Sequence, residues 1–395
     1  MEKRKDNKGR ILKTGESQRK DLIYQYRYTG ADGKRVTIYD SDLKALRERE
    51  KELQKLSIIG ANYSSNTIKV IELVEKYINL RQGARRNTKE FRLFTINTIK
   101  RDAFGNMQVR NVTMADAQEW VIRLNRDGKS YCSIKSIRGV VKPAFKMAVN
   151  EGVIYRNPFD FQLSDVIKND MSTRTALTQE QQNVWMSFIK NDHVYSKHYD
   201  EFVVLLGTGL RISEFCGLTL DDIDFENQRI NVDHQLCKSM TNEYFVENTK
   251  TKCGIRTIPM SSDVYDSLKN IVSNRIKSQK EYVVDGYTNF LNINRYGNPC
   301  VSYNYDSIFK SALNRYNKYH ADNPLPKITP HIMRHTFCTN MINAGVNIKT
   351  VQYLMGHSTA NITLNIYSHS DYDSVVSQVA SLNAYSNLKH NAIPV

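Results

Sequence analysis

The sequence reads His331-Ile-Met-Arg334-His335, then Leu354-Met-Gly-His357, and then Tyr367 in its last third. An arginine guanidinium stays charged at working pH, and its planar fork matches the geometry of a phosphate. Histidines exchange protons near neutral pH, and a tyrosine hydroxyl can act as a covalent nucleophile. Together these residue types predict a site that holds a phosphodiester and attacks it without a metal.

A second arginine lies upstream, in Thr208-Gly-Leu-Arg211-Ile-Ser-Glu214. The glycines around Thr208 allow a sharp turn between two helices, so Arg211 is expected to point from a helix start into a site shared with Arg334. Two guanidinium groups on one phosphate would stabilise the charge of a pentacoordinate transition state. On the helix of Arg334, His331 stands three residues earlier and is expected on the same face.

Each of these short sequence motifs, called boxes below, has an ordinary structural explanation when it is taken alone. A lone His-x-x-Arg is commonly a surface pair, Gly356-His357 could cap a helix, and Arg211 could be an ion-pair partner of Glu214. Their joint order favours the functional interpretation.

The boxes together resemble the tyrosine recombinase (phage integrase) family in kind, order and spacing, over residues 175–370. The N-terminal residues are similar to the arm-site binding domain of integrases from conjugative transposons. The resemblance implies a multidomain α+β fold. Its parts would be a small N-terminal β-hairpin and helix module, an all-α helical bundle, and a mainly α catalytic domain with a small antiparallel sheet.

The resemblance also implies a role for each box residue. Arg211 and Arg334 would clamp the scissile phosphate, and His357 would donate a hydrogen bond to a phosphate oxygen. His331 would act as a general acid or base near the nucleophile. Tyr367 would attack, leaving a 3′-phosphotyrosyl bond and a free 5′-hydroxyl.

The family further uses a lysine on a β-hairpin as the general acid for the leaving oxygen. Lys250 fits the family's Lys-Thr pattern best within residues 248–256, and Lys252 remains an alternative. Glu214 is expected to orient a neighbouring arginine or histidine, and His335 to pack beneath the site.

The composition argues against other chemistries. Six scattered cysteines without a C-x-x-C pair predict neither a disulfide framework nor a zinc site. The run Asp221-Asp222-x-Asp224 is the one candidate for Mg²⁺ ligands and is interpreted as a surface turn. No Gly-rich phosphate loop is present. We therefore expect no metal and no cofactor, which suits an isoenergetic exchange of phosphodiesters without ATP.

The positive charge lies in the first part of the chain. Residues 1–60 hold 16 Lys and Arg against 10 Asp and Glu, residues 61–160 hold 18 against 9, and the remainder holds 22 of each, for a net charge of +15. This predicts a polyanion partner, most often nucleic acid, with a solubilising surface as the alternative. The resemblance implies that the partner is double-stranded DNA, bound at core and arm sites. The segment 129–149 pairs an apolar face with a basic face that either binds DNA or is simply solvated: Lys129, Lys135, Arg138, Lys142 and Lys146.

The pattern along the chain predicts three domains. Their bounds are 1–60, a helical 66–161, and 175–395 with a C-terminal tail. The resemblance implies that these are an arm-site DNA-binding domain, a core-binding domain and a catalytic domain. Residues 1–20 are expected to form a mobile arm, followed by a hairpin of 22–28 and 35–39. Helices are predicted at 41–56, 88–101, 113–126, 130–151, 179–190, 199–218, 261–278, 302–318, 329–344, 347–355 and 359–368, and one small sheet at 228–234, 243–249 and 255–260.

The sequence therefore predicts a site-specific DNA recombinase that carries out the integration and excision of a mobile element. It would assemble as a tetramer on DNA, with an accessory DNA-bending or excision factor as a further partner. No apolar run or leader is evident, so a bacterial cytoplasmic, nucleoid-associated location without a membrane partner is expected. Two alternatives remain: a type IB topoisomerase-like enzyme that relaxes one duplex, and a non-catalytic DNA-binding regulator.

Overall fold

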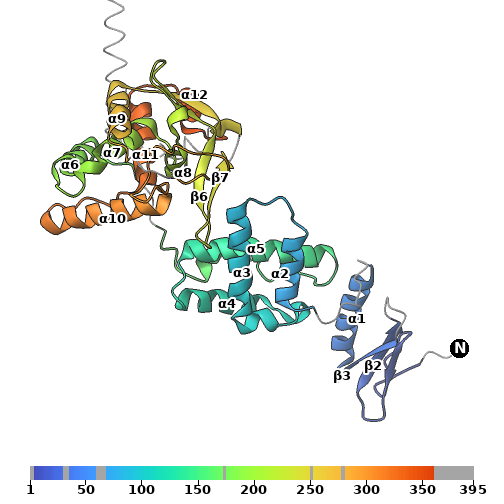
Figure 1. Cartoon of the computed structure of the whole chain (residues 1–395). Helices are drawn as coiled ribbons and strands as arrows, with labels where there is room; N and C mark the ends of the chain where they lie inside the picture. Colours follow the sequence, from blue (N-terminus) through green and yellow to red (C-terminus); the bar gives the residue numbers. More distant parts are fainter. Residues whose placement is uncertain are drawn as a thin grey trace, which may run out of the picture. The chain divides into compact units, whose positions relative to one another are not determined.

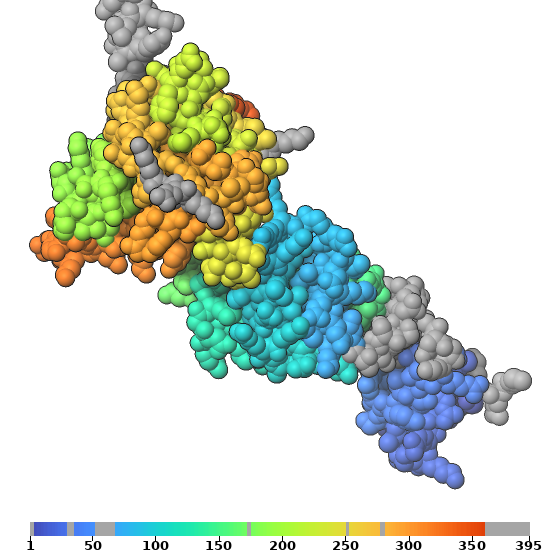
Figure 2. Space-filling model, in the orientation of Figure 1, coloured from blue at the N-terminus to red at the C-terminus, as the bar shows by residue number. Residues whose placement is uncertain are grey.

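The computed structural model describes residues 4–29, 35–58, 68–171, 175–249, 252–276 and 281–359. The chain forms two compact units, Met1–Ser172 and Thr173–Val395, and each is described by itself. Figures 1 and 2 colour the chain from blue at the N-terminus to red at the C-terminus. Tyr367, the predicted helix 359–368, the C-terminal tail and Lys250 lie outside the described residues.

The N-terminal module is a three-stranded antiparallel sheet with one helix on it (Figure 1). Its small core contains Tyr24, Leu43 and Leu46, with Tyr26 and Ile38 packed against them. The predicted hairpin and helix are confirmed. The elements are β1 (Glu16–Gln18), β2 (Tyr24–Thr29), β3 (Arg35–Asp40) and α1 (Leu43–Ile58).

The predicted mobile arm is wrong for residues 4–20, which belong to the folded module. Asp6 is buried and accepts hydrogen bonds from Arg10 Nε at 2.8 Å and from Tyr24 Oη at 3.0 Å. Glu16 in β1 pairs with Arg47 of α1 at 2.8 Å. The polar composition is misleading here, because tertiary partners satisfy the buried carboxylates.

The second part of the first unit is a helical bundle. A stack of aromatic rings fills its centre: Phe104 lies 4.7 Å from Trp120 in a stacked pair, and Phe159 meets both rings edge-on. The Thr113 and Ser130 side chains cap the two helices that follow them. The helices are α2 (Val70–Asn79), α3 (Arg86–Lys100), α4 (Met114–Arg126) and α5 (Tyr131–Asn150), with 3-10 turns at Ala103–Asn106, Val109–Asn111 and Leu163–Asp165.

The second unit is mainly helical with short antiparallel strands. Its core includes Trp185, Phe202 and Phe309, and the last two rings stack at 4.3 Å. The helices are α6 (Gln179–Asn191), α7 (Tyr199–Thr208), α8 (Ile212–Gly217), α9 (Ser262–Ser273), α10 (Ser302–Tyr319), α11 (Pro330–Asn343) and α12 (Ile348–Met355). The strands are β4 (Ile223–Asp224), β5 (Arg229–Val232), β6 (His234–Lys238), β7 (Tyr244–Asn248) and β8 (Arg256–Pro259), with 3-10 turns at Ser196–His198, Leu220–Asp222 and Lys252–Gly254.

Two predictions for this unit need correction. The predicted single sheet is two: β4, β5 and β8 form one, and β6 pairs with β7 in a separate hairpin. The extended segment is interrupted at Asp233, so that β5 ends before this residue and β6 starts after it. The Asp233 carbonyl accepts a hydrogen bond from the Thr249 amide at 3.1 Å. The predicted helix 199–218 is likewise two helices, α7 and α8.

Gly209 separates α7 from α8 and positions the second helix. Its φ is +64°, a left-handed conformation that glycine adopts without strain. A Cβ at this position would lie 2.3 Å from Cδ1 of Phe337, so the turn also packs directly on α11. The start of α8 and the middle of α11 are thereby brought together. None of the described helices is long and apolar enough to cross a membrane.

Candidate active site

Arg334 is a buried arginine held by backbone carbonyls. The Thr329 hydroxyl caps α11 and Pro330 occupies its first turn, as the sequence predicts. One turn on, Arg334 Nη1 donates to the Gly209 carbonyl at 2.6 Å, and Nη2 donates to the Met355 carbonyl. The turn before α8 and the end of α12 are thus held to α11 by one guanidinium.

Arg211 lies at the N-cap of α8, and its side chain reaches the turn at Gly356 that follows α12. Its Nη2 donates to the Gly356 carbonyl at 3.1 Å, and its Nη1 donates to Glu214 Oε1 at 2.5 Å. Gly356 ends α12 with φ +59°, which turns successive carbonyls toward the two arginines. The Arg211 side chain remains one third exposed, so it can still meet a ligand. The structure therefore brings Arg211 and Arg334 together, as expected.

Glu214 is the carboxylate at the centre of this cluster. It is 2% exposed, and its Oε2 accepts from Arg256 Nη2 at 2.9 Å and from the Arg211 amide at 3.0 Å. Arg334 Nη1 lies 4.0 Å from the same oxygen. Burial by itself would raise the pKa of Glu214, but the charges of Arg256, Arg211 and Arg334 outweigh it and lower the pKa. Glu214 is therefore ionised at neutral pH.

Arg256 is a third arginine that the sequence analysis did not assign to the site. Its side chain is fully buried, and Nε donates to the Leu354 carbonyl at 2.7 Å and Nη1 to the Gly254 carbonyl at 3.0 Å. Alternation along β8 could have found it, because the partly exposed Thr257 lies between the buried Arg256 and Ile258. A charged residue on the buried face of a strand indicates a partner of opposite charge.

His357 follows Gly356 and is buried beside the arginines. Burial and the charges of Arg334 and Arg211 lower its pKa to about 3. At neutral pH the imidazole is uncharged and donates from one ring nitrogen only. Burial and the neighbouring arginine charges also lower the pKa of Arg334, to about 9, which leaves it charged at neutral pH.

His331 and His335 lie one turn apart on α11. Their ring centroids are 4.8 Å apart. His331 is exposed in the first turn of the helix, whereas His335 is half-buried one turn further along.

The two candidate general acids belong to the segment between β7 and β8. Lys250 lies outside the described residues, and Lys252 is described only through its backbone, in the turn Lys252–Gly254. That turn runs beside the candidate site, because a Cβ on Gly356 would lie 3.1 Å from the Cys253 carbonyl oxygen. The turn Lys252–Gly254, which follows β7 in the chain, thus lies next to the His357 turn.

One carboxylate-rich group in the described part of the chain has the spacing of metal ligands: Asp222, Asp233 and His234. The His234 Nδ1 lies 2.5 Å from Asp233 Oδ1, and its Nε2 lies 2.7 Å from the Gly217 carbonyl. Asp222 accepts from the Thr219 amide and hydroxyl at 2.7 Å each, as a turn cap does. These partners engage both ring nitrogens, so the group is better explained as a structural hydrogen-bond network.

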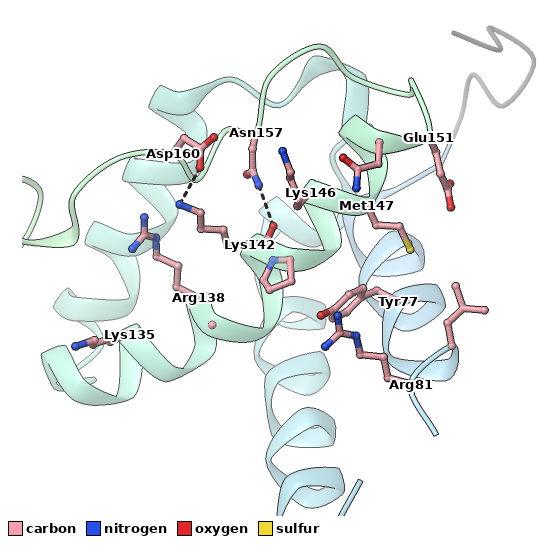
Figure 3. A pocket seen from close by; sticks show the side chains of 14 residues that line it. Tyr77, Arg81, Lys135, Arg138, Lys142, Lys146, Met147, Glu151, Asn157 and Asp160 are labelled. Carbon is pink, nitrogen blue, oxygen red and sulfur yellow. Dashed lines mark hydrogen bonds and ion pairs between the residues drawn. The ribbon is translucent and has the colours of Figure 1, made fainter. Parts of the chain in front are cut away.

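A basic groove of about 830 Å³ lies on the helical bundle, between the end of α2 and the length of α5 (Figure 3). Four of the five predicted DNA-contacting residues line it: Lys135, Arg138, Lys142 and Lys146. The exposed side chains of Lys135 and Lys146 extend from α5, whereas Lys142 Nζ pairs with Asp160 at 2.8 Å.

Two of the predicted contacts have packing roles in this domain. Arg138 donates to the Phe159 carbonyl at 2.6 Å and to the Phe161 carbonyl, and it stacks on the Phe161 ring. These contacts fasten the segment after α5 to that helix. The Lys129 ammonium lies 5.8 Å from the centre of the Phe94 ring.

Comparison with known proteins agrees with this geometry. The sequence profile of the phage integrase family matches residues 175–374, and that of the DNA-binding domain of Tn916 integrase matches residues 1–56. The transposase from transposon Tn1545 of Streptococcus pneumoniae and that from Tn916 of Enterococcus faecalis are each 42% identical, over 97% of this chain and 97% of theirs. The structure of the Tn1549 transposon integrase with a circular intermediate DNA is 42% identical with a TM-score of 0.74, covering 80% of this chain and 99% of that one.

The chain therefore belongs to the phage integrase family of tyrosine recombinases. It is a site-specific DNA recombinase, an enzyme that cleaves and religates DNA strands. The family, fold class and recombinase function expected from the sequence are confirmed, and the topoisomerase and regulator alternatives are not favoured.

Proposed function

We propose that the arginine cluster holds the scissile phosphate while Tyr367 attacks it. The Tyr367 oxygen would bond to phosphorus as the 5′-oxygen leaves, and that oxygen would take a proton from Lys250 or Lys252. His331 would exchange the tyrosine proton, and His357 would donate to a phosphate oxygen. The supporting observation is that three carbonyls and Glu214 hold Arg211 and Arg334 side by side while Arg211 stays partly exposed.

Strand exchange in the presence of EDTA tests this mechanism. The substrates would be two labelled duplexes that carry the junction and target sites of the element, incubated with the full chain. Recombinant products without a metal or ATP support the proposal, because the phosphotyrosyl bond conserves the energy of the cleaved phosphodiester. Relaxation of a single supercoiled duplex without exchange would instead point to the topoisomerase-like mechanism.

We further propose that the three predicted domains divide the work on DNA. Residues 1–60 would bind arm sites, 66–161 the core site, and 175–395 would carry out catalysis with the C-terminal tail. The profile match of residues 1–56 to a DNA-binding domain supports the first of these assignments. With separate arm and core contacts, one chain would bridge two segments of DNA.

Removal of residues 1–60 is expected to spare cleavage of an isolated core site and to reduce recombination on long DNA that carries arm sites. The reason is that the arm module would bring affinity through a second DNA contact and take no part in the chemistry. Adduct formation on short core duplexes and recombination on long attachment sites measure the two effects. Unchanged recombination on the long sites would contradict the arm-site assignment.

The working assembly is proposed to be a tetramer on DNA, because exchange between two duplexes cuts four strands and needs four active sites. An accessory DNA-bending or excision factor would set the direction of the reaction. Since the substrate is the DNA of a bacterial mobile element, the protein would act in the cytoplasm at the nucleoid.

The double variant Lys135→Ala/Lys146→Ala is expected to weaken DNA binding and to flatten its salt dependence. If each ammonium neutralises one phosphate, the slope of log affinity against log salt falls by about 2 in magnitude. Lys100→Ala is the matched control, because Lys100 already pairs with Glu75 at 2.8 Å. Binding measured by fluorescence anisotropy at several salt concentrations gives both slopes. Equal slopes for the double variant and the wild type would place the DNA on another face.

A further inference from the structure

Arg256 joins three separate segments of the candidate site through three different nitrogens. Nε holds the Leu354 carbonyl in the last turn of α12, Nη1 holds the Gly254 carbonyl in the turn Lys252–Gly254, and Nη2 holds Glu214 on α8. Because Gly356 and His357 follow directly on α12, the position of the His357 turn depends on this guanidinium. The same holds for the turn Lys252–Gly254.

Arg256 cannot itself contact DNA, since its side chain is fully buried. A buried guanidinium is costly to desolvate unless charged and polar partners compensate it. Here each of the three guanidinium nitrogens has a hydrogen-bond partner. Each partner belongs to a segment that carries a residue of the proposed mechanism. Any effect of Arg256 on the reaction must therefore act through Glu214, the turn Lys252–Gly254 and the His357 turn.

By binding Glu214, Arg256 limits how strongly this carboxylate can pair with Arg211. Glu214 Oε1 pairs with the Arg211 guanidinium, and its Oε2 accepts from Arg256 and from the Arg211 amide. Without Arg256, Oε2 could accept a second bond from the Arg211 side chain in place of the lost one, and a bidentate pair would draw that guanidinium toward the protein interior. The phosphate would then compete with a full carboxylate for Arg211.

We infer that Arg256 is a positioning residue for DNA cleavage, which keeps Arg211 directed at the phosphate and holds the turn Lys252–Gly254 against the His357 turn. The inference rests on the proposed function of the cluster. It also accounts for the charge of the site: Arg211, Arg256 and Arg334 with Glu214 leave two net positive charges. A phosphodiester attacked by a tyrosinate gains a second negative charge in the transition state, so the preorganised charge matches the one that develops.

Two substitutions separate charge from position. Arg256→Met removes the charge and all three hydrogen bonds, whereas Arg256→Lys keeps the charge but reaches with a single nitrogen. Arg275→Met is the matched control. Arg275 of the same unit pairs with both oxygens of Glu281 at 2.7 Å and donates to the Phe290 carbonyl at 3.0 Å, away from the arginine cluster.

The experiment measures single-turnover formation of the covalent adduct by the full chain on a nicked core-site duplex, together with DNA affinity and melting temperature. We expect Arg256→Met to lower the rate at saturating DNA by about 100-fold with little change in affinity, and Arg256→Lys by about 10-fold. Arg275→Met should lower the melting temperature by a similar amount and keep the rate within about threefold of the wild type.

The double variant Glu214→Gln/Arg256→Met tests the competition for Arg211. Because it restores the two net positive charges and removes the competing carboxylate, it should cleave faster than Arg256→Met alone. If Arg256→Met does not fold, Arg256→Lys and the double variant decide the question. Equal rate losses in the Arg256 and Arg275 variants would overturn the inference. If the wild type forms no adduct, the proposed function itself fails, which is a distinguishable result.

Discussion

Tyr367→Phe is expected to abolish the covalent protein–DNA adduct while leaving DNA affinity unchanged. The substitution removes one oxygen, the proposed attacking atom, and keeps the ring. A tyrosine hydroxyl has a pKa near 10 and is a poor nucleophile at neutral pH unless positive charge or a base assists it. Arg211, Arg334 and the nearby histidines would supply that assistance at one position only, so no other tyrosine should substitute. The rate should fall by about 10⁴-fold or more.

A nicked, end-labelled core-site duplex, incubated in EDTA and separated on a denaturing gel, provides the measurement. Tyr372→Phe is the matched control, because Tyr372 lies five residues downstream in the same C-terminal segment. A labelled adduct with the wild type and with Tyr372→Phe, but not with Tyr367→Phe, identifies the nucleophile. A persistent adduct with Tyr367→Phe would move the nucleophile to another residue.

The sequence predicted the convergence of Arg211 and Arg334, because both lie in boxes with a strong local structural signal. Gly209 marks the sharp turn before Arg211, and Thr329 with Pro330 marks the start of the helix of Arg334. The pairing of the two arginines through carbonyls of the turn after α12 was not predictable. The sequence allows Gly356 to cap a helix, which it does in a left-handed conformation, but it does not show that this turn packs against the two arginines.

Arg256 illustrates a second limit. Its main partner, Glu214, lies on a different element 42 residues earlier in the chain. Sequence patterns describe a residue's own helix or strand and do not show which distant charge will neutralise it. The same reason explains the error at residues 4–20, where buried Asp6 and Glu16 depend on tertiary partners. Most helix bounds were predicted closely, since capping residues and apolar spacing act locally. The exceptions are the predicted helix 199–218, which is two helices, and the predicted helix 261–278, which ends at Ser273.

The split of the predicted sheet has a related cause. Alternating apolar residues predicted strands near the correct positions, but alternation does not specify which strands pair. The break at Asp233 separates β5 from β6 and sends each to a different partner. The β6–β7 hairpin therefore stands apart from the sheet that carries Arg256.

Arg334→Lys is expected to reduce adduct formation by about 10³-fold. The guanidinium holds the Gly209 and Met355 carbonyls with two nitrogens, and it would hold the scissile phosphate in the proposed function. A lysine has one ammonium nitrogen, which cannot reach both carbonyls, so the start of α8 and the end of α12 would no longer be held by one side chain. The site would keep its positive charge, but the Gly209 and Met355 carbonyls would no longer be fixed together.

Comparison of Arg334→Lys with Arg275→Lys separates this effect from general destabilisation, because Arg275 belongs to the same unit and its side chain is 12% exposed and paired with Glu281. Single-turnover rates at saturating DNA and melting temperatures give the two readouts. Arg334→Lys should lose rate far beyond its loss of stability, whereas Arg275→Lys should lose stability alone. If Arg334→Lys retained the wild-type rate, charge alone would be sufficient at this position. The carbonyl contacts that define the cluster would then serve the fold and not the reaction.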